Sequence, residues 1–120
     1  MILFGSLFTA SAQAYSIYGT ATFAGSYPDS VVNNARINVY KDLGGGQWQY
    51  HGSTTASACG YYTYGTGESG TFKAVVVQDD YDLRSLSSCG SVTDNVNAEG
   101  YGIGTVTWLN PEIVVNIPCD

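Results

Sequence analysis

The sequence predicts an all-β protein: an antiparallel, Greek-key-type β-sandwich of about seven to eight short strands. Three observations predict it, namely short runs of alternating apolar and polar residues, glycine-rich turns between them, and the absence of helical periodicity. The pattern is clearest at residues 35–77, where turns at residues 44–46, at Gly60 and at residues 65–70 separate four strands. A period of two places one face of each strand in a core.

The first expected strand covers residues 15–23. Ile17 and Ala21 alternate there with Tyr18 and its polar neighbours, as expected for a strand with one buried face. The residues at 24–34 include Gly, Pro, Asp and an Asn pair, which favour turns and predict a loop.

The second expected strand covers residues 35–41. Alternation places Ile37 and Val39 in the core. The outward residues of this strand are expected to be Arg36, Asn38 and Tyr40.

Further strands are expected at residues 47–55, 61–64, 71–78, 101–109 and 112–117. Residues 74–77 are all apolar, so both faces of that strand should be covered. The last two strands are expected to pair around a tight reversal at residues 110–111. Residues 83–89 fit a short strand or irregular structure, and residues 91–100 are polar and loop-like.

The composition fits one extracellular domain. The chain has 120 residues, near the commonest domain size, and its 44% hydrophobic residues lie in patterned strands, which argues against disorder. Four basic and ten acidic residues give a net charge of −6, which argues against nucleic-acid binding because phosphates would be repelled. Only 12% of the residues are charged while ten are tyrosines, a balance that suits a hydroxyl-rich surface at the cell exterior.

Residues 1–14 predict a signal peptide with a truncated n-region, which precedes a single domain at residues 15–120. An apolar run at residues 2–8 is followed by small residues, so cleavage is expected between Ala14 and Tyr15. No Lys or Arg precedes the apolar run, so either the start codon is placed too far downstream or the export signal is truncated. The alternative to a signal peptide is that these residues form an apolar first strand. The mature chain is expected to be secreted, extracellular or periplasmic, without a membrane span.

Three cysteines fit an oxidising compartment. A Cys89–Cys119 disulfide would tie down the C-terminal strand, and closing a loop of about 30 residues stabilises by roughly 3–4 kcal/mol. Cys59 could replace either partner, so three single pairings stay open. Zinc is not expected, because there is no CxxC motif and His51 is the one histidine.

Two sets of side chains are candidates for binding. Three carboxylates follow the strand at residues 71–78: Asp79, Asp80 and Asp82. They are weak calcium candidates, and a solvated turn is the preferred interpretation because the Gly and the distal Glu of an EF-hand loop are missing. Aromatic side chains that could stack on sugars or anchor a protein interface, or else cover the core, are Tyr18, Tyr40, Trp48, Tyr50, Tyr62 and Trp108.

Four segments together resemble the carboxypeptidase regulatory-like and transthyretin-like (prealbumin-like) β-sandwich group: residues 17–21 (IYGTA), 35–40 (ARINVY), 52–55 (GSTT) and 60–62 (GYY). The resemblance covers about half the chain and implies a β-sandwich in which Gly60 makes a tight turn and an aromatic residue two positions later packs across the sandwich. It also implies an accessory, adhesive or carrier role.

Enzymes on related scaffolds need residues that this chain lacks. Hydroxyisourate hydrolases use several His and Arg residues, and intradiol dioxygenases hold iron with two Tyr and two His, whereas this chain has His51 alone. Self-crosslinking pilin-type domains place a lysine on the first strand, where this chain has none, although Lys73 alternates with Val75 and could be buried. His51 lacks a G-x-S-x-G partner motif, and a structural role is expected for it.

The sequence therefore predicts a non-enzymatic module without a cofactor, with a structural, adhesive or protein-interaction role at the cell exterior and a capacity to self-associate. A carbohydrate-binding module that uses the exposed Tyr and Trp side chains is the alternative, and a small hydrolase is a remote one. Its expected partners are a protein or a glycan.

Overall fold

The described part of the chain consists of strands joined by turns. The computed structural model describes residues 14–23, 32, 34–81 and 96–119, with the backbone alone for residues 23, 77–81 and 96–98. It contains no helix among these residues, so the predicted all-β class is confirmed. The strands are β1 (Ser16–Phe23), β2 (Arg36–Gly44), β3 (Gln47–Thr55), β4 (Tyr61–Gly65), β5 (Gly70–Tyr81), β6 (Val96–Val106), β7 (Glu112–Val114) and β8 (Ile117–Cys119).

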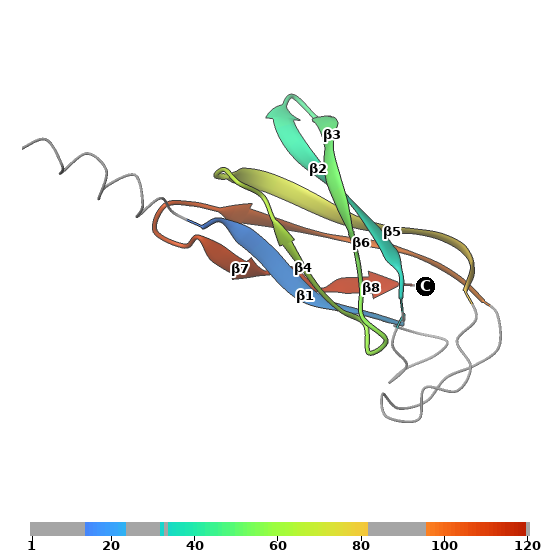
Figure 1. Cartoon of the computed structure of the whole chain (residues 1–120). Coiled ribbons are helices and arrows are strands. Elements are labelled where there is room, and N and C mark those ends of the chain that lie inside the picture. Colours follow the sequence, from blue (N-terminus) through green and yellow to red (C-terminus); the bar gives the residue numbers. More distant parts are fainter. Residues whose placement is uncertain (1–13, 24–31, 33, 82–95, 120) are drawn as a thin grey trace, which may run out of the picture.

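The strands form one continuous curled sheet rather than two separate ones. The hydrogen-bonded order is β3-β2-β5-β6-β8-β1-β4, and β7 pairs with β1. The sheet has two limbs that face each other, one made of β3, β2, β5 and β6 and the other of β4, β1 and β7 (Figure 1). Strand β8 connects the limbs, because it pairs with β6 of one and with β1 of the other. The sheet is mixed, because β1 runs parallel to β7 and β8, so the expectation of a wholly antiparallel sandwich was wrong in this respect.

The first five strands lie where alternation predicts them, whereas the C-terminal part differs. Residues 96–100 were expected to be loop-like, but they begin β6 and pair with the end of β5. The chain does reverse at residues 107–110, where Thr107 and Asn110 exchange two backbone hydrogen bonds of 3.1 Å. Beyond this turn β7 pairs with β1 and not with β6, so the expected closing hairpin was wrong.

The core lies between the two limbs. Ile37 and Val39 of β2 are buried as predicted, and they pack with Phe72 of β5 and Ile17 of β1. Gly60 has a φ of +81°, a left-handed conformation that glycine adopts without strain and that turns the chain into β4. No helix in the described part is long and apolar enough to cross a membrane.

A stripe of alternating glycines on β6 lets the C-terminal segment lie directly on that strand. A methyl group at Gly100 would collide with the carbonyl oxygen of Pro118, and one at Gly102 with that of Asn116. At Gly104 it would lie 2.6 Å from the Ile113 side chain. Because these positions carry no side chains, the backbone of residues 116–119 lies against Gly100 and Gly102, and the side chains of Ile113 and Val115 lie against Gly104. This close approach lets β8 reach both limbs.

The cysteines differ from the predicted pairing. Cys59 is disulfide-bonded. Cys119 on β8 is buried in the core and keeps its thiol, which donates a hydrogen bond to the carbonyl oxygen of Ile117 at 3.8 Å. The expected Cys89–Cys119 disulfide was therefore wrong. The side chain of Cys119 points into the apolar interior, and Cys59, the alternative partner, is the bonded cysteine. Cys89 lies outside the described residues.

Replacing Gly102 with alanine tests the glycine stripe. The added methyl group meets backbone atoms of Asn116 that cannot move aside cheaply, so we expect a loss of about 2 kcal/mol in the free energy of unfolding, measured by urea denaturation. Gly65→Ala is the matched control, because Gly65 is exposed on β4 and an added methyl group would lie 4.0 Å from its nearest neighbour, the carbonyl oxygen of Tyr15. Equal stability of the two variants would contradict the close approach.

A non-reducing digest analysed by mass spectrometry tests the cysteine assignment. We expect Cys59 in a disulfide-linked peptide that separates on reduction, and a Cys119 peptide that alkylates only after unfolding because its thiol is buried. A Cys59 that alkylates in the folded, unreduced protein would contradict this assignment.

Candidate functional site

The limb made of β3, β2, β5 and β6 is the larger one, and its outer surface carries a cluster of side chains that we call the aromatic face. Tyr50, Tyr40, Lys73 and Ile103 occupy one row across β3, β2, β5 and β6, because the strand registers pair each with the next. Alternation points them outward, since Val39, Phe72 and Ala74 on the same strands are buried. The members of the aromatic face are Tyr40, Trp48, Tyr50, Lys73, Tyr101 and Ile103.

Lys73 lies at the centre of the aromatic face. Its Nζ is 4.5 Å from the ring centre of Trp48 and 5.6 Å from that of Tyr101, a geometry for cation–π attraction. The Tyr40 and Tyr50 rings meet edge to face, with centres 5.8 Å apart and planes at 75°. Tyr50, Tyr101 and Ile103 remain more than half exposed, so the face offers apolar area around one positive charge.

The predicted aromatic residues do not form one site. Tyr40, Trp48 and Tyr50 meet on the aromatic face, whereas Tyr18 is on the outer side of the other limb and Trp108 is exposed in the turn after β6. Tyr62 is buried, so its place among the exposed candidates was wrong. Its hydroxyl donates a hydrogen bond to the carbonyl oxygen of Val115 at 2.5 Å, and burial raises the pKa of the phenol.

Sequence reasoning missed three members of the aromatic face: Lys73, Tyr101 and Ile103. Tyr101 and Ile103 alternate with Gly102 and Gly104 along β6, and a strand whose inward residues are glycines must place its large side chains outward. This alternation was the available signal. Lys73 was considered as a buried lysine, but it is half-buried on the outward side of β5, with its ammonium group over the ring of Trp48.

The outer surface of the smaller limb carries a shallow groove that we call the tyrosine groove. It has a volume of about 670 Å³. Tyr18 on β1 and Tyr61 on β4 are 42% and 63% exposed, and Val114 on β7 is opposite Tyr18 in the register. The lining consists of Ser16, Tyr18, Gly19, Thr20, Tyr61, Tyr62, Thr63, Glu112, Val114 and Asn116.

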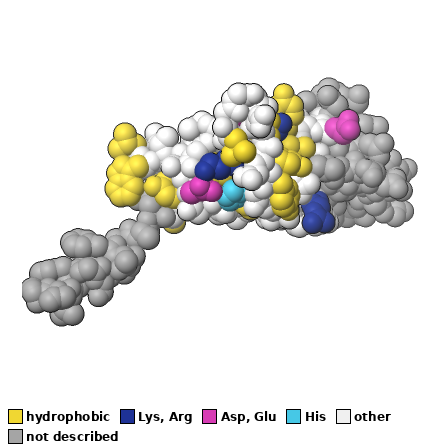
Figure 2. Space-filling model, turned by 90° about the horizontal axis from the view of Figure 1, so that it is seen from above, with side chains coloured by type: hydrophobic (Ala, Val, Ile, Leu, Met, Phe, Trp, Pro, Cys, Tyr) yellow, Lys and Arg dark blue, Asp and Glu magenta, His cyan; other side chains and the backbone are white. Residues whose placement is uncertain are grey.

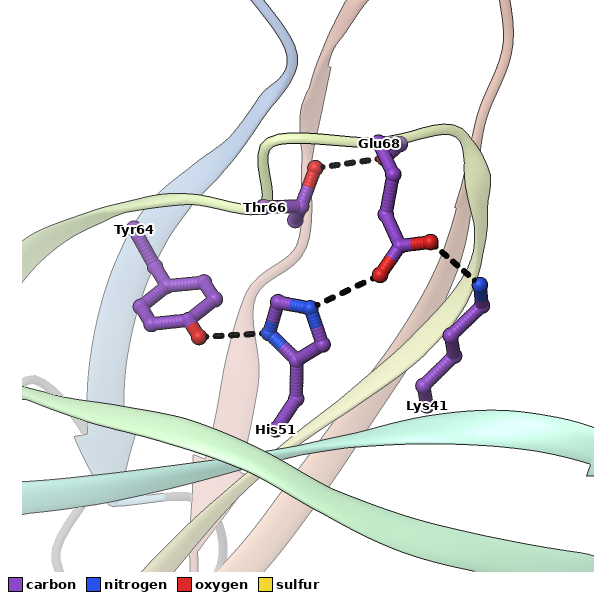
Figure 3. Close-up of polar contacts among 5 residues, drawn as sticks. All are labelled: Lys41, His51, Tyr64, Thr66 and Glu68. Carbon is purple, nitrogen blue, oxygen red and sulfur yellow. Dashed lines mark hydrogen bonds and ion pairs between the residues drawn. The ribbon is translucent and has the colours of Figure 1, made fainter.

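A polar cluster spans the side of the molecule where the limbs are not joined by backbone pairing. His51 on β3 contacts the hydroxyl of Tyr64 on β4 through Nδ1, at 2.6 Å, and the carboxylate of Glu68 through Nε2, at 3.1 Å (Figure 3). The other oxygen of Glu68 accepts a hydrogen bond from Lys41 Nζ at 2.6 Å. Figure 2 shows the histidine beside acidic and basic side chains on this surface.

The polar cluster connects β3 to β4 and to Glu68 through side chains. The hydrogen bond from Lys41, and then that from His51, holds the pKa of the Glu68 carboxyl below its usual range. Burial, helped by Tyr50 and Glu68, raises the pKa of Tyr64, which favours the protonated phenol. His51 also packs edge to face on Phe72, with ring centres 5.1 Å apart, which anchors it to the core.

No metal centre is visible in the described part of the chain, where no three His, Cys, Asp or Glu side chains are grouped for one. The calcium candidates fall partly outside the described residues. Asp79 and Asp80 belong to β5 by their backbone, and Asp82 lies beyond it.

Comparisons with known proteins identify the fold alone. No protein-family model and no curated protein matches the sequence. Among 46 similar chains of solved structures is a 9R-lipoxygenase from Cyanothece PCC8801, with a TM-score of 0.51 and 15% identity. The match covers 88% of this chain but 17% of the lipoxygenase chain, so it concerns one small part of that enzyme.

The polar cluster predicts a loss of stability in acid. A carboxyl whose pKa is lower in the folded than in the unfolded state stabilises above its unfolded pKa, and this contribution is lost as the pH falls through the folded value. For Glu68 this window begins near the ordinary glutamate value of 4.5 and extends below it. We expect the melting temperature of Glu68→Gln to fall less steeply with decreasing pH than that of the wild type.

Glu112→Gln is the control for this measurement, because Glu112 lies in the tyrosine groove on the other limb. The effect of Glu68→Gln should be modest, since its carboxylate is exposed to solvent. An equally steep fall of the melting temperature with decreasing pH in the wild type and in Glu68→Gln would contradict the assignment.

Proposed function

We propose that this chain is an exported, non-enzymatic all-β module that binds a protein partner at the cell exterior through its aromatic face. The observation that carries the proposal is the gathering of Trp48, Tyr101 and two further tyrosines around Lys73 on one exposed sheet surface. Trp and Tyr are the residues that most often dominate binding energy at protein interfaces.

The ammonium group of Lys73 offers the aromatic face a partner for a single carboxylate of the bound protein. The chain carries a net charge of −6, yet the centre of this face is the ammonium group of Lys73. Carboxylates border the face, because Asp42 pairs with Trp48 in the register and Glu99 precedes Tyr101 by two positions on β6. A carboxylate on the partner could pair with Lys73 while apolar groups cover Ile103, and such complementarity fixes orientation and raises the association rate.

The arrangement of the rings favours a protein over a glycan on this face. Sugars stack on ring faces that are open to solvent, but Lys73 lies over the ring of Trp48. Tyr40 and Tyr50 are nearly perpendicular, so they form no common flat surface. A protein surface has side chains of different shapes and can therefore pack against rings set at different angles.

The resemblance to the carboxypeptidase regulatory-like and transthyretin-like group supports an accessory or adhesive role. The left-handed Gly60 and the buried Tyr62 have the geometry that this resemblance implies for the turn before β4. The disulfide of Cys59 supports export, since disulfides persist in oxidising compartments. His51 is held between Tyr64 and Glu68 and packs on Phe72, which supports a structural role for this histidine.

Photo-crosslinking tests the proposal. A benzophenone amino acid at position 101 should give one discrete protein adduct in the organism that expresses the chain, either with a different protein or with a second copy. The same probe at position 61, on the opposite limb, is the control. We then expect Tyr101→Ala to weaken binding of the purified partner by about 2 kcal/mol, roughly 30-fold, and Tyr61→Ala to leave it unchanged.

The proposal fails if position 101 gives no adduct, or if both positions crosslink equally to many proteins. It also fails if Tyr101→Ala binds the purified partner as tightly as the wild type. Circular dichroism should show that both variants fold, because both side chains are more than half exposed.

A further inference from the structure

We propose that the tyrosine groove is a second binding site, and that its ligand is a neutral oligosaccharide. This site lies on the limb opposite the aromatic face and is independent of the function proposed above. Its volume of about 670 Å³ is in the range of ligand sites.

Two exposed rings give the groove its stacking surfaces. Tyr18 pairs with Thr63 and Tyr61 pairs with Thr20, so the two tyrosines are diagonal neighbours on adjacent antiparallel strands. Diagonal neighbours of this kind have Cα atoms roughly 7–8 Å apart. Unlike Trp48 on the other limb, neither ring has a cation placed over it in the described structure. The apolar faces of two linked sugar units can therefore stack on them.

Polar groups beside the rings match the hydroxyls of a sugar. Thr20 and Thr63 provide hydroxyl groups, and Glu112 provides a carboxylate that can accept hydrogen bonds from two neighbouring hydroxyls. The side-chain oxygen of Asn116 accepts from the backbone nitrogen of Thr20 at 3.1 Å and lies 3.4 Å from its hydroxyl. These contacts orient the amide and leave its NH₂ group as the donor for a ligand.

The charge of the lining selects against anionic ligands. Glu112 is the one charged residue among those that line the groove, and no basic residue is among them. A phosphate, a sulfate or a uronic acid would bring a second negative charge beside Glu112 without a cation to balance it. A neutral pyranose offers both an apolar face and hydroxyl groups, which is the chemistry that this lining matches.

A second hollow extends the site along β4. It has a volume of about 320 Å³ and shares Tyr61, Tyr62 and Thr63 with the tyrosine groove. Its other lining residues, Thr54, Thr55 and Ser57, all carry hydroxyl groups. Tyr61 lines both hollows and is exposed, so a ligand that stacks on this ring can reach both. A chain of several sugar units fits this arrangement better than a monosaccharide.

Calorimetric titration with neutral oligosaccharides tests the inference. The panel should contain cello-, xylo-, malto- and chito-oligosaccharides, with oligogalacturonate as the anionic comparison. We expect at least one neutral series to bind with an affinity that rises with chain length, and oligogalacturonate not to bind. Tyr61→Ala should weaken binding about tenfold. Tyr101→Ala, on the opposite limb, is the matched control and should change it less than twofold.

Each other outcome overturns the inference in a distinct way. Absence of binding across the neutral panel excludes the ligand class, and preference for oligogalacturonate contradicts the charge argument. Binding that Tyr101→Ala abolishes and Tyr61→Ala leaves intact would place the sugar on the aromatic face. Because Tyr61 is exposed, its replacement should not unfold the chain, and Thr63→Val provides a second variant in the same groove.

Discussion

The close approach of the C-terminal segment to β6 is the constraint on which the rest of the structure depends. Gly100, Gly102 and Gly104 carry no side chains on the inner side of this strand; the backbone of residues 116–119 lies against the first two glycines, and the side chains of Ile113 and Val115 lie against the third. As a result β8 pairs with both limbs, and the sheet curls over its own core. The same glycines leave Tyr101 and Ile103 as the outward groups of β6, so one pattern shapes both the fold and the aromatic face.

The opposite side of the molecule is closed by side chains instead of backbone. β3 and β4 are the two ends of the sheet, and His51 with Tyr64 connects them. Gly52 next to His51 leaves room for the Tyr64 hydroxyl, which a larger residue would displace. The curled sheet is thus held by a backbone connection on one side and by a polar cluster on the other. Both outer faces stay open, one with a lysine at its centre and one with a carboxylate in its lining.

Much of the local structure could be predicted from the sequence, because it follows from local alternation. Ile37 and Val39 on β2, and the turn at Gly60, needed no knowledge of distant partners. The C-terminal half could not be predicted in this way. Whether residues 96–100 form a strand depends on β5, and the partner of β7 depends on β1, which is about 100 residues away in the sequence.

The candidate site residues also divide into those that the local sequence predicts and those that depend on distant strands. Tyr40, Trp48 and Tyr50 could be proposed as a group because they lie on neighbouring strands of one hairpin. Lys73, Tyr101 and Tyr61 could not, since their roles come from the register between strands and from which limb each strand joins. Tyr62 was misplaced for a related reason, because adjacent residues of a strand face opposite ways and a shift of one position exchanges buried with exposed.

The glycine stripe can be tested most directly by nuclear Overhauser effects in the folded protein. The structure predicts strong contacts from the α-protons of Gly100 and Gly102 to the protons of residues 115–119, of the same order as those between β5 and β6. A spectrum with the β5–β6 contacts intact but none between β6 and the C-terminal segment would contradict the curled sheet, and with it the placement of both binding faces.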